Sequence, residues 1–226
     1  MLTLGIIPAR SGSKGIKDKN IIPVGGQPLI SWTIKQAMNA QLDRVIVSTD
    51  SKEYKEKIDS WFPGMDLVPF IRPAKLAKDD TPTSKVILNI LDMCPEYDMF
   101  VLLEPTAPLR LTRNITEPLV MVRDGKAKAV VSVCASHRCH PAVSFELGMR
   151  DHKFLIRDTP SPRRQALRPY YHQTGTVYVA DADWYREHKT FITSETVGYV
   201  VESWQDKEVD EESDIPAIVP FLERVK

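Results

Sequence analysis

Four basic side chains near the start of the chain have a spacing suited to binding a polyphosphate. An apolar run at residues 4–7 ends at Pro8 and opens into a loop with glycines at positions 12 and 15. The basic residues of this loop are Arg10, Lys14, Lys17 and Lys19. Glycines let backbone N–H groups face a ligand, and the cations can reach different phosphate oxygens. We therefore expect a strand followed by a phosphate-binding loop; a solvated basic turn after an edge strand is the alternative.

This loop matches neither of the two most common phosphate-binding motifs. No Gly-Lys-Ser/Thr follows at Walker A spacing, and the Gly-x-Gly-x-x-Gly pattern of dinucleotide-binding folds is absent. The sequence therefore indicates a polyphosphate-binding loop that belongs to neither of these two motif classes.

A second charged group lies near the carboxyl terminus, where residues 206–214 read DKEVDEESD. These carboxylates could cap a closing helix, because the helix dipole stabilises negative charge at its N-terminus. If the chain is extended here, alternation instead places Glu208 and Asp210 on one face, where they could share one hard cation. The residue types leave both interpretations open.

Histidine and cysteine give no strong metal-binding pattern. His137, Cys139 and His140 lie together, but neighbouring Cys139 and His140 are hard to bring onto one tetrahedral ion, and no second pair has finger-like spacing. We interpret His172 as a packed or hydrogen-bonding residue, and no Ser/His/Asp or Cys/His arrangement stands out. All three cysteines are expected to be reduced and mostly structural thiols.

Composition narrows the function classes. The 226 residues carry 30 basic and 30 acidic side chains, so no overall field favours binding to nucleic acid or to an anionic membrane. No apolar run reaches about 20 residues and no signal-type segment opens the chain, so we expect a cytoplasmic protein without a membrane segment.

Alternating strand and helix patterns predict an α/β fold with a mostly parallel sheet covered by helices. Strands are expected at residues 4–7, 44–48, 66–70, 98–103, 129–134, 176–180 and 198–201. Helices are expected at residues 28–40, 51–60, 84–93, 112–123, 181–188 and 213–224. Residues 135–171 break the pattern and are interpreted as an inserted arm within a single domain spanning residues 1–226.

The turn EPTAPLR at residues 104–110 follows an expected strand. Its two prolines restrict the backbone, and ligands of open α/β sheets bind at the carboxyl ends of strands. The turn is therefore a candidate ligand-binding segment, with a plain tight loop as the alternative.

The string IPARSGSKGIKDKN at residues 7–20 resembles the nucleotide-binding signature of the CMP-N-acylneuraminate synthetases, cytidylyltransferases that activate sialic acid and related nonulosonic acids. The resemblance continues in order along nearly the whole chain. Further matching segments are VIVSTDS at 45–51, RPAKLAKDDTPTS at 72–84, EPTAPLR at 104–110, RRQ at 163–165, TGTVY at 174–178 and EVDEESD at 208–214.

The resemblance implies a Rossmann-like nucleotidyltransferase that transfers CMP from CTP to the anomeric hydroxyl of a nonulosonic acid and releases pyrophosphate. It also implies a homodimer whose arm reaches the neighbouring active site, and Mg²⁺ (or Mn²⁺) held by Asp210 with Glu208. The implied catalytic residues are Arg10, Lys14, Lys19 and Asp210. The implied nucleotide-binding residues are Arg10, Ser13, Lys14, Asn20, Arg72 and Thr83. The implied sugar-acid-binding residues are Glu104, Thr106, Arg164, Gln165 and Thr174.

The chain departs from the family pattern at several positions. Glu104 stands where the family usually has Gln, Thr174 where it has Asn, and Glu208 where it has the first metal-binding Asp. The resemblance implies that most of these positions face the sugar, so the activated acid can differ from N-acetylneuraminate. The alternatives are a nucleotidyltransferase that uses another base or a sugar 1-phosphate, and a non-catalytic nucleotide-binding module.

Replacing Lys14 by Ala is predicted to weaken CTP binding roughly tenfold or more, because one charge-assisted contact of about 1.5–3 kcal/mol is lost. The melting temperature should not change. Calorimetric titration with CTP measures the effect, and an unchanged affinity would contradict the assignment of a phosphate-binding loop.

Overall fold

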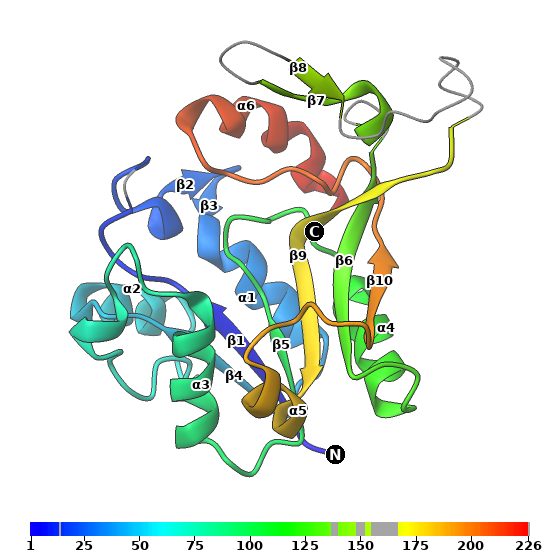
Figure 1. Cartoon of the computed structure of the whole chain (residues 1–226). Helices are drawn as coiled ribbons and strands as arrows, with labels where there is room; N and C mark the ends of the chain where they lie inside the picture. The colour runs from blue at the N-terminus through cyan, green and yellow to red at the C-terminus, as the bar shows by residue number, and fades with distance from the viewer. Residues whose placement is uncertain (14, 137–139, 148–151, 155–166, 226) are drawn as a thin grey trace.

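A six-stranded sheet forms the centre of the computed structural model (Figure 1). The structure describes residues 1–13, 15–136, 140–147, 152–154 and 167–225. The strand order is β10-β6-β9-β5-β1-β4. β9 is antiparallel to its neighbours β5 and β6, and the remaining pairs are parallel, which confirms the prediction of a mostly parallel sheet. The strands are β1 (Thr3–Pro8), β4 (Arg44–Ser48), β5 (Met99–Leu102), β6 (Ala129–Ala135), β9 (Tyr171–Asp181) and β10 (Thr196–Val200).

Helices cover both faces of this sheet because successive strand side chains point to opposite sides. Val101 of β5 belongs to a core cluster with Ile34 of α1, whereas the preceding Phe100 packs with Ile90 of α3 and Tyr185 of α5. α2 and α4 contribute to the first cluster as well. The helices are α1 (Leu29–Asn39), α2 (Lys52–Trp61), α3 (Thr83–Met93), α4 (Arg113–Arg123) and α5 (Ala182–His188).

The closing helix is shorter than expected. The structure divides the predicted helix at 213–224 into consecutive helical pieces, and Pro216 and Pro220 lack the N–H that a continuous helix requires. Leu222 nevertheless packs against Trp32 of α1 in a third core cluster, so the carboxyl terminus is attached to the domain. The pieces are η5 (Glu212–Asp214), α6 (Ile215–Ile218) and η6 (Val219–Arg224).

Short elements lie between the main strands and helices. The 3-10 helix η1 (Lys19–Ile21) and the strands β2 (Pro23–Val24) and β3 (Gln27–Pro28) connect the opening loop to α1. η2 (Ala74–Leu76) precedes α3. In the predicted arm, η3 (Pro141–Val143) leads to an antiparallel pair, β7 (Phe145–Leu147) with β8 (His152–Phe154).

The prediction of a strand at residues 66–70 is wrong. Leu67 and Val68 are buried, so the apolar residues do enter the core, but the segment is not a strand. Pro69 has no N–H to offer a ladder. The backbone meets the end of β4 through isolated hydrogen bonds, such as that from Val47 N to Leu67 O at 2.7 Å.

β9 is longer than the predicted strand at 176–180 and contains an irregularity opposite Ser132. The pairing with β6 shifts register between Val131 and Val133. The Ser132 hydroxyl compensates for the missing ladder bonds: it accepts from Val177 N at 2.9 Å and donates toward the carbonyls of this stretch of β9. The backbone at residues 174–176 is thereby released from the ladder and can bind other groups.

The cysteines and the length of the helices bear on two expectations drawn from composition. Cys94 and Cys134 are buried free thiols, in line with the expectation for reduced structural cysteines, and Cys139 lies outside the described residues. Within the described part of the chain, no helix is both long enough and apolar enough to cross a membrane.

Candidate functional site

A pocket of about 410 Å³ lies at the carboxyl ends of the neighbouring parallel strands β1 and β5. This is the edge at which open α/β sheets bind ligands. Its walls come from the opening loop, the loop before α3, the turn after β5 and the acidic segment near the carboxyl terminus. The predicted site residues that line it are Arg10, Ser13, Lys19, Asn20, Arg72, Thr83, Glu104, Thr106, Glu208 and Asp210.

The opening loop is fixed by hydrogen bonds at both ends. Asp50, which follows β4, accepts from the backbone N–H and from the hydroxyl of Ser11, both at 2.8 Å. Asn20 is buried and donates from Nδ2 to the carbonyl of Arg10 at 3.0 Å. The described part of the loop is therefore held in place without a ligand, and Asn20 also has a structural role.

Two of the loop's cations form ion pairs across the pocket. Arg10 Nη1 lies 2.5 Å from Asp79 Oδ1, and Lys19 Nζ lies 2.9 Å from Asp210 Oδ1. The Lys19 side chain is only 16% exposed, so its charge is partly shielded from water. The opening loop thus contacts two acidic segments that are distant in the sequence.

Arg72 supplies a further buried cation. Its Nε donates to Ser48 Oγ at 3.0 Å and its Nη2 donates to the Ser48 carbonyl, which ties it to the end of β4. Burial lowers the pKa of Arg72 to about 10, so the guanidinium remains charged at neutral pH. A fixed cation of this kind suits an anionic ligand.

The acidic segment divides its carboxylates between two roles. Asp214 accepts from the backbone N–H of Asp210 and of Glu211, each at 2.8 Å, and these bonds lower its pKa. It therefore caps the closing helical pieces. Glu208 and Asp210 instead line the pocket on either side of Val209, which is buried and donates its N–H to the carbonyl of Thr106 at 2.8 Å.

Arg110 is buried beneath the pocket and forms hydrogen bonds to several of the segments that make up the site. It is 1% exposed, and its guanidinium donates to the carbonyls of Glu104, Gly175 and Thr176 and to the hydroxyl of Thr33. The turn after β5 is thereby connected to α1 and to the irregular part of β9. Burial lowers the pKa of Arg110 to about 10, and it remains protonated.

Glu104 and Glu208 lie against the same glycine. A Cβ on Gly175 would lie 2.5 Å from Glu104 Oε2 and 2.6 Å from Glu208 Oε1, so a larger residue here would displace both carboxylates. Glu208 Oε1 also accepts from Gly175 N at 2.7 Å. Burial, followed by the charges of Glu208 and Asp210, raises the pKa of Glu104 to about 7.

This arrangement fits a hard divalent cation. The donors are carboxylate oxygens, which Mg²⁺ and Mn²⁺ prefer. Crowded negative charge that raises the pKa of Glu104 would be relieved by a bound cation. Gly15 leaves room for this group to approach the opening loop, because a Cβ there would lie 2.7 Å from the Asp210 carbonyl oxygen.

Some predicted site residues are not placed in the pocket. Lys14, Arg164 and Gln165 lie outside the described residues. Thr174 does not line the pocket: its hydroxyl donates to Ser132 Oγ at 2.9 Å and therefore stabilises the irregularity in β9. A contact between Thr174 and a substrate stays a prediction.

Sequence reasoning missed two features. Arg110 closes the EPTAPLR segment, but nothing in the sequence showed that it would be fully buried. The structure also brings Cys134, His172 and Asp206 together, with Ser136 beside His172, although no Cys/His arrangement was expected. These residues are far apart in the chain and carry no motif. Of His137, Cys139 and His140, which the sequence analysis considered as a zinc site, only His140 lies within the described residues. Its Nδ1 accepts a hydrogen bond from Ala142 N.

The sheet, its helices and this charged pocket define a protein with a Rossmann-like nucleotidyltransferase fold. A solved structure titled CMP:2-keto-3-deoxy-manno-octonic acid synthetase complexed with CTP has the same fold, with a TM-score of 0.73, 17% identity and 99% of each chain covered. The family model described as cytidylyltransferase matches residues 4–130. The chain belongs to this cytidylyltransferase family.

Two relatives show the extent of the similarity. The N-acylneuraminate cytidylyltransferase of Escherichia coli O18:K1:H7 (strain RS218 / NMEC) is 28% identical over 98% of this chain, which spans 52% of that protein. The pseudaminic acid cytidylyltransferase of Campylobacter jejuni subsp. jejuni serotype O:2 (strain ATCC 700819 / NCTC 11168) is 38% identical, over 79% of this chain and 78% of its own length. The chain thus spans about half the length of the first relative.

Replacing Arg110 by Met is predicted to lower the free energy of unfolding by about 3–5 kcal/mol, because the buried carbonyls of Glu104, Gly175 and Thr176 lose their donor and the Glu104 carboxylate loses a nearby positive charge. Urea unfolding followed by circular dichroism measures the change. Arg123→Met, at an exposed position in the last turn of α4, is the control and should change stability by less than about 0.5 kcal/mol. Equal effects of the two substitutions would contradict the assigned role.

Replacing Glu104 by Gln is predicted to stabilise the ligand-free, chelator-treated protein above pH 7. The pKa of Glu104 is raised from 4.5 to about 7, so the folded state binds more protons in that interval and stability falls as pH rises through it. The gain in Glu104→Gln should approach about 2–3 kcal/mol above pH 7 and shrink toward pH 4.5.

Melting curves between pH 4.5 and 8 measure this gain. Glu56→Gln, at an exposed position on α2, is the matched control and should show no such trend. A Glu104→Gln protein whose stability follows the wild type at every pH would argue against the charge crowding.

Proposed function

We propose that the protein transfers CMP from CTP to the anomeric hydroxyl of a nonulosonic acid and releases pyrophosphate. The observation that carries this proposal is a single pocket in which the cations Arg10 and Lys19 face the carboxylates of Glu208 and Asp210. A polyphosphate and its counter-ion need both kinds of group. The names of the relatives, which act on N-acylneuraminate or pseudaminic acid, support the choice of substrates.

The reaction requires alignment and charge neutralisation, because the sugar hydroxyl attacks the α-phosphorus directly and no covalent enzyme intermediate is needed. Arg10 and Lys14 neutralise the triphosphate in this proposal, and Lys19 steadies the α-phosphate or the attacking oxygen. Arg72 and Thr83 contribute to the nucleotide side of the pocket. The hydrogen bonds that Asp50 accepts from Ser11 and the one that Asn20 donates to Arg10 keep the loop ready for CTP.

Asp210 and Glu208 would hold Mg²⁺ (or Mn²⁺) in this proposal. When bound, the ion supplies charge neutralisation for the triphosphate and the departing pyrophosphate. Glu208 is positioned by the N–H of Gly175, and Asp210 by its ion pair with Lys19. Glu is one methylene longer than the family's Asp, so we assign Asp210 the larger share of the coordination.

The acceptor side is assigned to Glu104 and Thr106, together with Arg164 and Gln165 of the arm. A sugar 1-phosphate would bring a dianion toward Glu104 and Glu208, and burial followed by the charge of Glu208 already raises the pKa of Glu104. A hydroxyl acceptor with a single carboxylate avoids most of this repulsion. The arrangement therefore favours a sugar acid.

The assembly and location complete the proposal. We place the whole chain in one domain, with residues 135–171 as an arm that dimerises and reaches the partner's active site, and we place the protein in the cytoplasm. The described hairpin of β7 and β8 supports an arm at this position. Sedimentation measures the dimer.

A pyrophosphate-release assay tests the activity. CTP should support turnover with at least one member of a panel of nonulosonic acids, and sugar 1-phosphates should not substitute. Release only with sugar 1-phosphates would favour the alternative enzyme. No release with any acceptor, despite tight CTP binding, would favour a binding module.

Replacing Asp210 by Asn is predicted to lower kcat by orders of magnitude in magnesium without unfolding the protein, because a charge opposite a divalent ion is removed while the shape remains. Glu208→Asp is the companion variant and should have a mild effect. Magnesium titrations of both variants measure the difference. Normal activity in Asp210→Asn alongside an inactive Glu208→Asp would show that the principal ligand is Glu208.

A further inference from the structure

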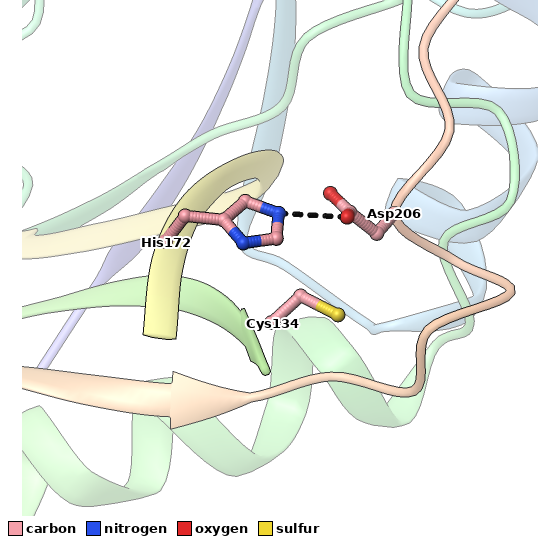
Figure 2. Close-up of side chains that lie close together, drawn as sticks. All are labelled: Cys134, His172 and Asp206. Atoms are coloured by element: carbon pink, nitrogen blue, oxygen red, sulfur yellow. Dashed lines mark hydrogen bonds and ion pairs between the residues drawn. The ribbon is translucent and has the colours of Figure 1, made fainter. Parts of the chain in front are cut away.

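Three potential metal ligands from separate parts of the chain converge at the end of the sheet that carries the arm. Figure 2 shows the His172 ring directed at Asp206, with the Cys134 thiol beside them. One ligand atom from each residue, Cys134 Sγ, a His172 ring nitrogen and an Asp206 carboxylate oxygen, lies within 4.8 Å of the other two. Among the described residues, this is the one set of three or more such groups that lie this close.

The sheet itself places two of these side chains together. Cys134 on β6 and His172 on β9 are directly opposite each other in the antiparallel register. Directly opposed residues have Cβ atoms about 4.5–5.5 Å apart and point to the same face. Backbone pairing therefore brings their Cβ atoms together, and the side-chain rotamers then set the distance between the sulfur and the ring nitrogens.

Asp206 is brought to this pair by an anchored turn. Val201 N donates to the carbonyl of Val133 at 2.9 Å, which attaches the segment after β10 to the edge of β6. Gln205 is 2% exposed, and its amide donates to Asn114 Oδ1, so the residue just before Asp206 is fixed in the core. The carboxylate is consequently held at the ends of the two strands.

A second hydrogen bond sets the orientation of the imidazole. His172 Nδ1 lies 2.9 Å from Ser136 Oγ, and Nε2 lies 2.7 Å from Asp206 Oδ2. The 2.7 Å contact requires a proton between Nε2 and the carboxylate. A metal ion would replace that proton, and Nδ1–H would then donate to the serine hydroxyl. Histidine ligands of metals commonly donate their other ring N–H to an oxygen in this way.

A nucleophilic role suits these residues less well. Cys134 is 2% exposed, and burial together with the Asp206 charge raises the pKa of its thiol. Reactive cysteines show the opposite, with exposed sulfur and a lowered pKa.

We propose that Cys134, His172 and Asp206 form a binding site for a divalent transition-metal ion of the zinc class. The donor set of one sulfur, one imidazole nitrogen and one carboxylate oxygen suits Zn²⁺ and excludes a preference for Mg²⁺. Ligands at about 2.0–2.3 Å from a tetrahedral ion lie roughly 3.3–3.8 Å apart. Binding therefore requires His172 Nε2 and Asp206 Oδ2 to separate from 2.7 Å, within a group whose ligand atoms all lie within 4.8 Å of one another. A water completes the coordination.

This site is separate from the proposed catalytic ion but is connected to the same pocket. Asp206 precedes Glu208 by two residues, and His172 precedes Gly175, whose N–H binds Glu208, by three. A bound ion would therefore fix both segments that position Glu208. The inference does not depend on the proposed reaction.

Cobalt binding tests the proposal. The full-length, tag-free protein is stripped with chelator and titrated with Co²⁺ in excess Mg²⁺, which occupies all-oxygen sites. A thiolate-to-cobalt charge-transfer band should appear in the near ultraviolet, saturate at one ion per chain and vanish when Zn²⁺ is added. Absence of the band at saturating Co²⁺ overturns the proposal.

Cysteine variants identify the sulfur. Cys134→Ser should abolish the band, whereas the double variant Cys94→Ser, Cys139→Ser, in which Cys134 is the remaining thiol of the chain, should retain it. If Cys134→Ser does not fold, the double variant still decides the question. Loss of the band in the double variant, or its persistence in Cys134→Ser, overturns the assignment.

Variants of the other two ligands complete the test. His172→Gln and Asp206→Asn should each weaken Co²⁺ binding tenfold or more, while Asp210→Asn should leave the charge-transfer band unchanged. A pattern in which Asp210→Asn removes the band and His172→Gln does not would show that the ion lies in the pocket, and would overturn the separate site.

Discussion

The charge of Arg110 is enclosed by protein on every side, and the geometry of the pocket depends on how that charge is satisfied. A buried guanidinium is tolerated only when its donors are matched by acceptors. Here the acceptors include the carbonyls of Glu104, Gly175 and Thr176, so the turn after β5 and the irregular stretch of β9 cannot move apart without stranding a cation. The carboxylate of Glu104 is held near Glu208 as a result.

The irregularity opposite Ser132 is the other half of this arrangement. A regular β9 would use the N–H of Gly175 and the carbonyls beside it in ladder bonds. Because the Ser132 hydroxyl takes over part of the pairing, the N–H becomes available to Glu208 and the carbonyls to Arg110. A buried hydroxyl on the strand next to β9 thus influences the charge distribution of a pocket that it does not line.

The sequence predicted those features of the fold and the site that depend on local patterns and on the order of motifs. Alternating apolar runs located most helices and strands, and the motif order identified Arg10, Lys19, Glu208 and Asp210, which the structure places in one pocket. It failed where the outcome depends on contacts between distant residues. Apolar Leu67 and Val68 are buried without forming a strand. The meeting of Cys134 and His172 follows from strand register, and that of Asp206 with them from a distant turn, neither of which a local pattern encodes.

The arm leaves and rejoins the sheet at a closed stem. Ala135 and Tyr171 are directly opposed in the ladder, and Ser136 N donates to the carbonyl of Tyr170 at 2.7 Å. The ends of the insertion are therefore brought together by the sheet, and the entropy lost in closing it grows only slowly with its length. Evolution can lengthen, shorten or replace this segment while the register of the core stays the same, so the part of the molecule assigned to acceptor choice and subunit contact can diverge independently of the part assigned to the nucleotide.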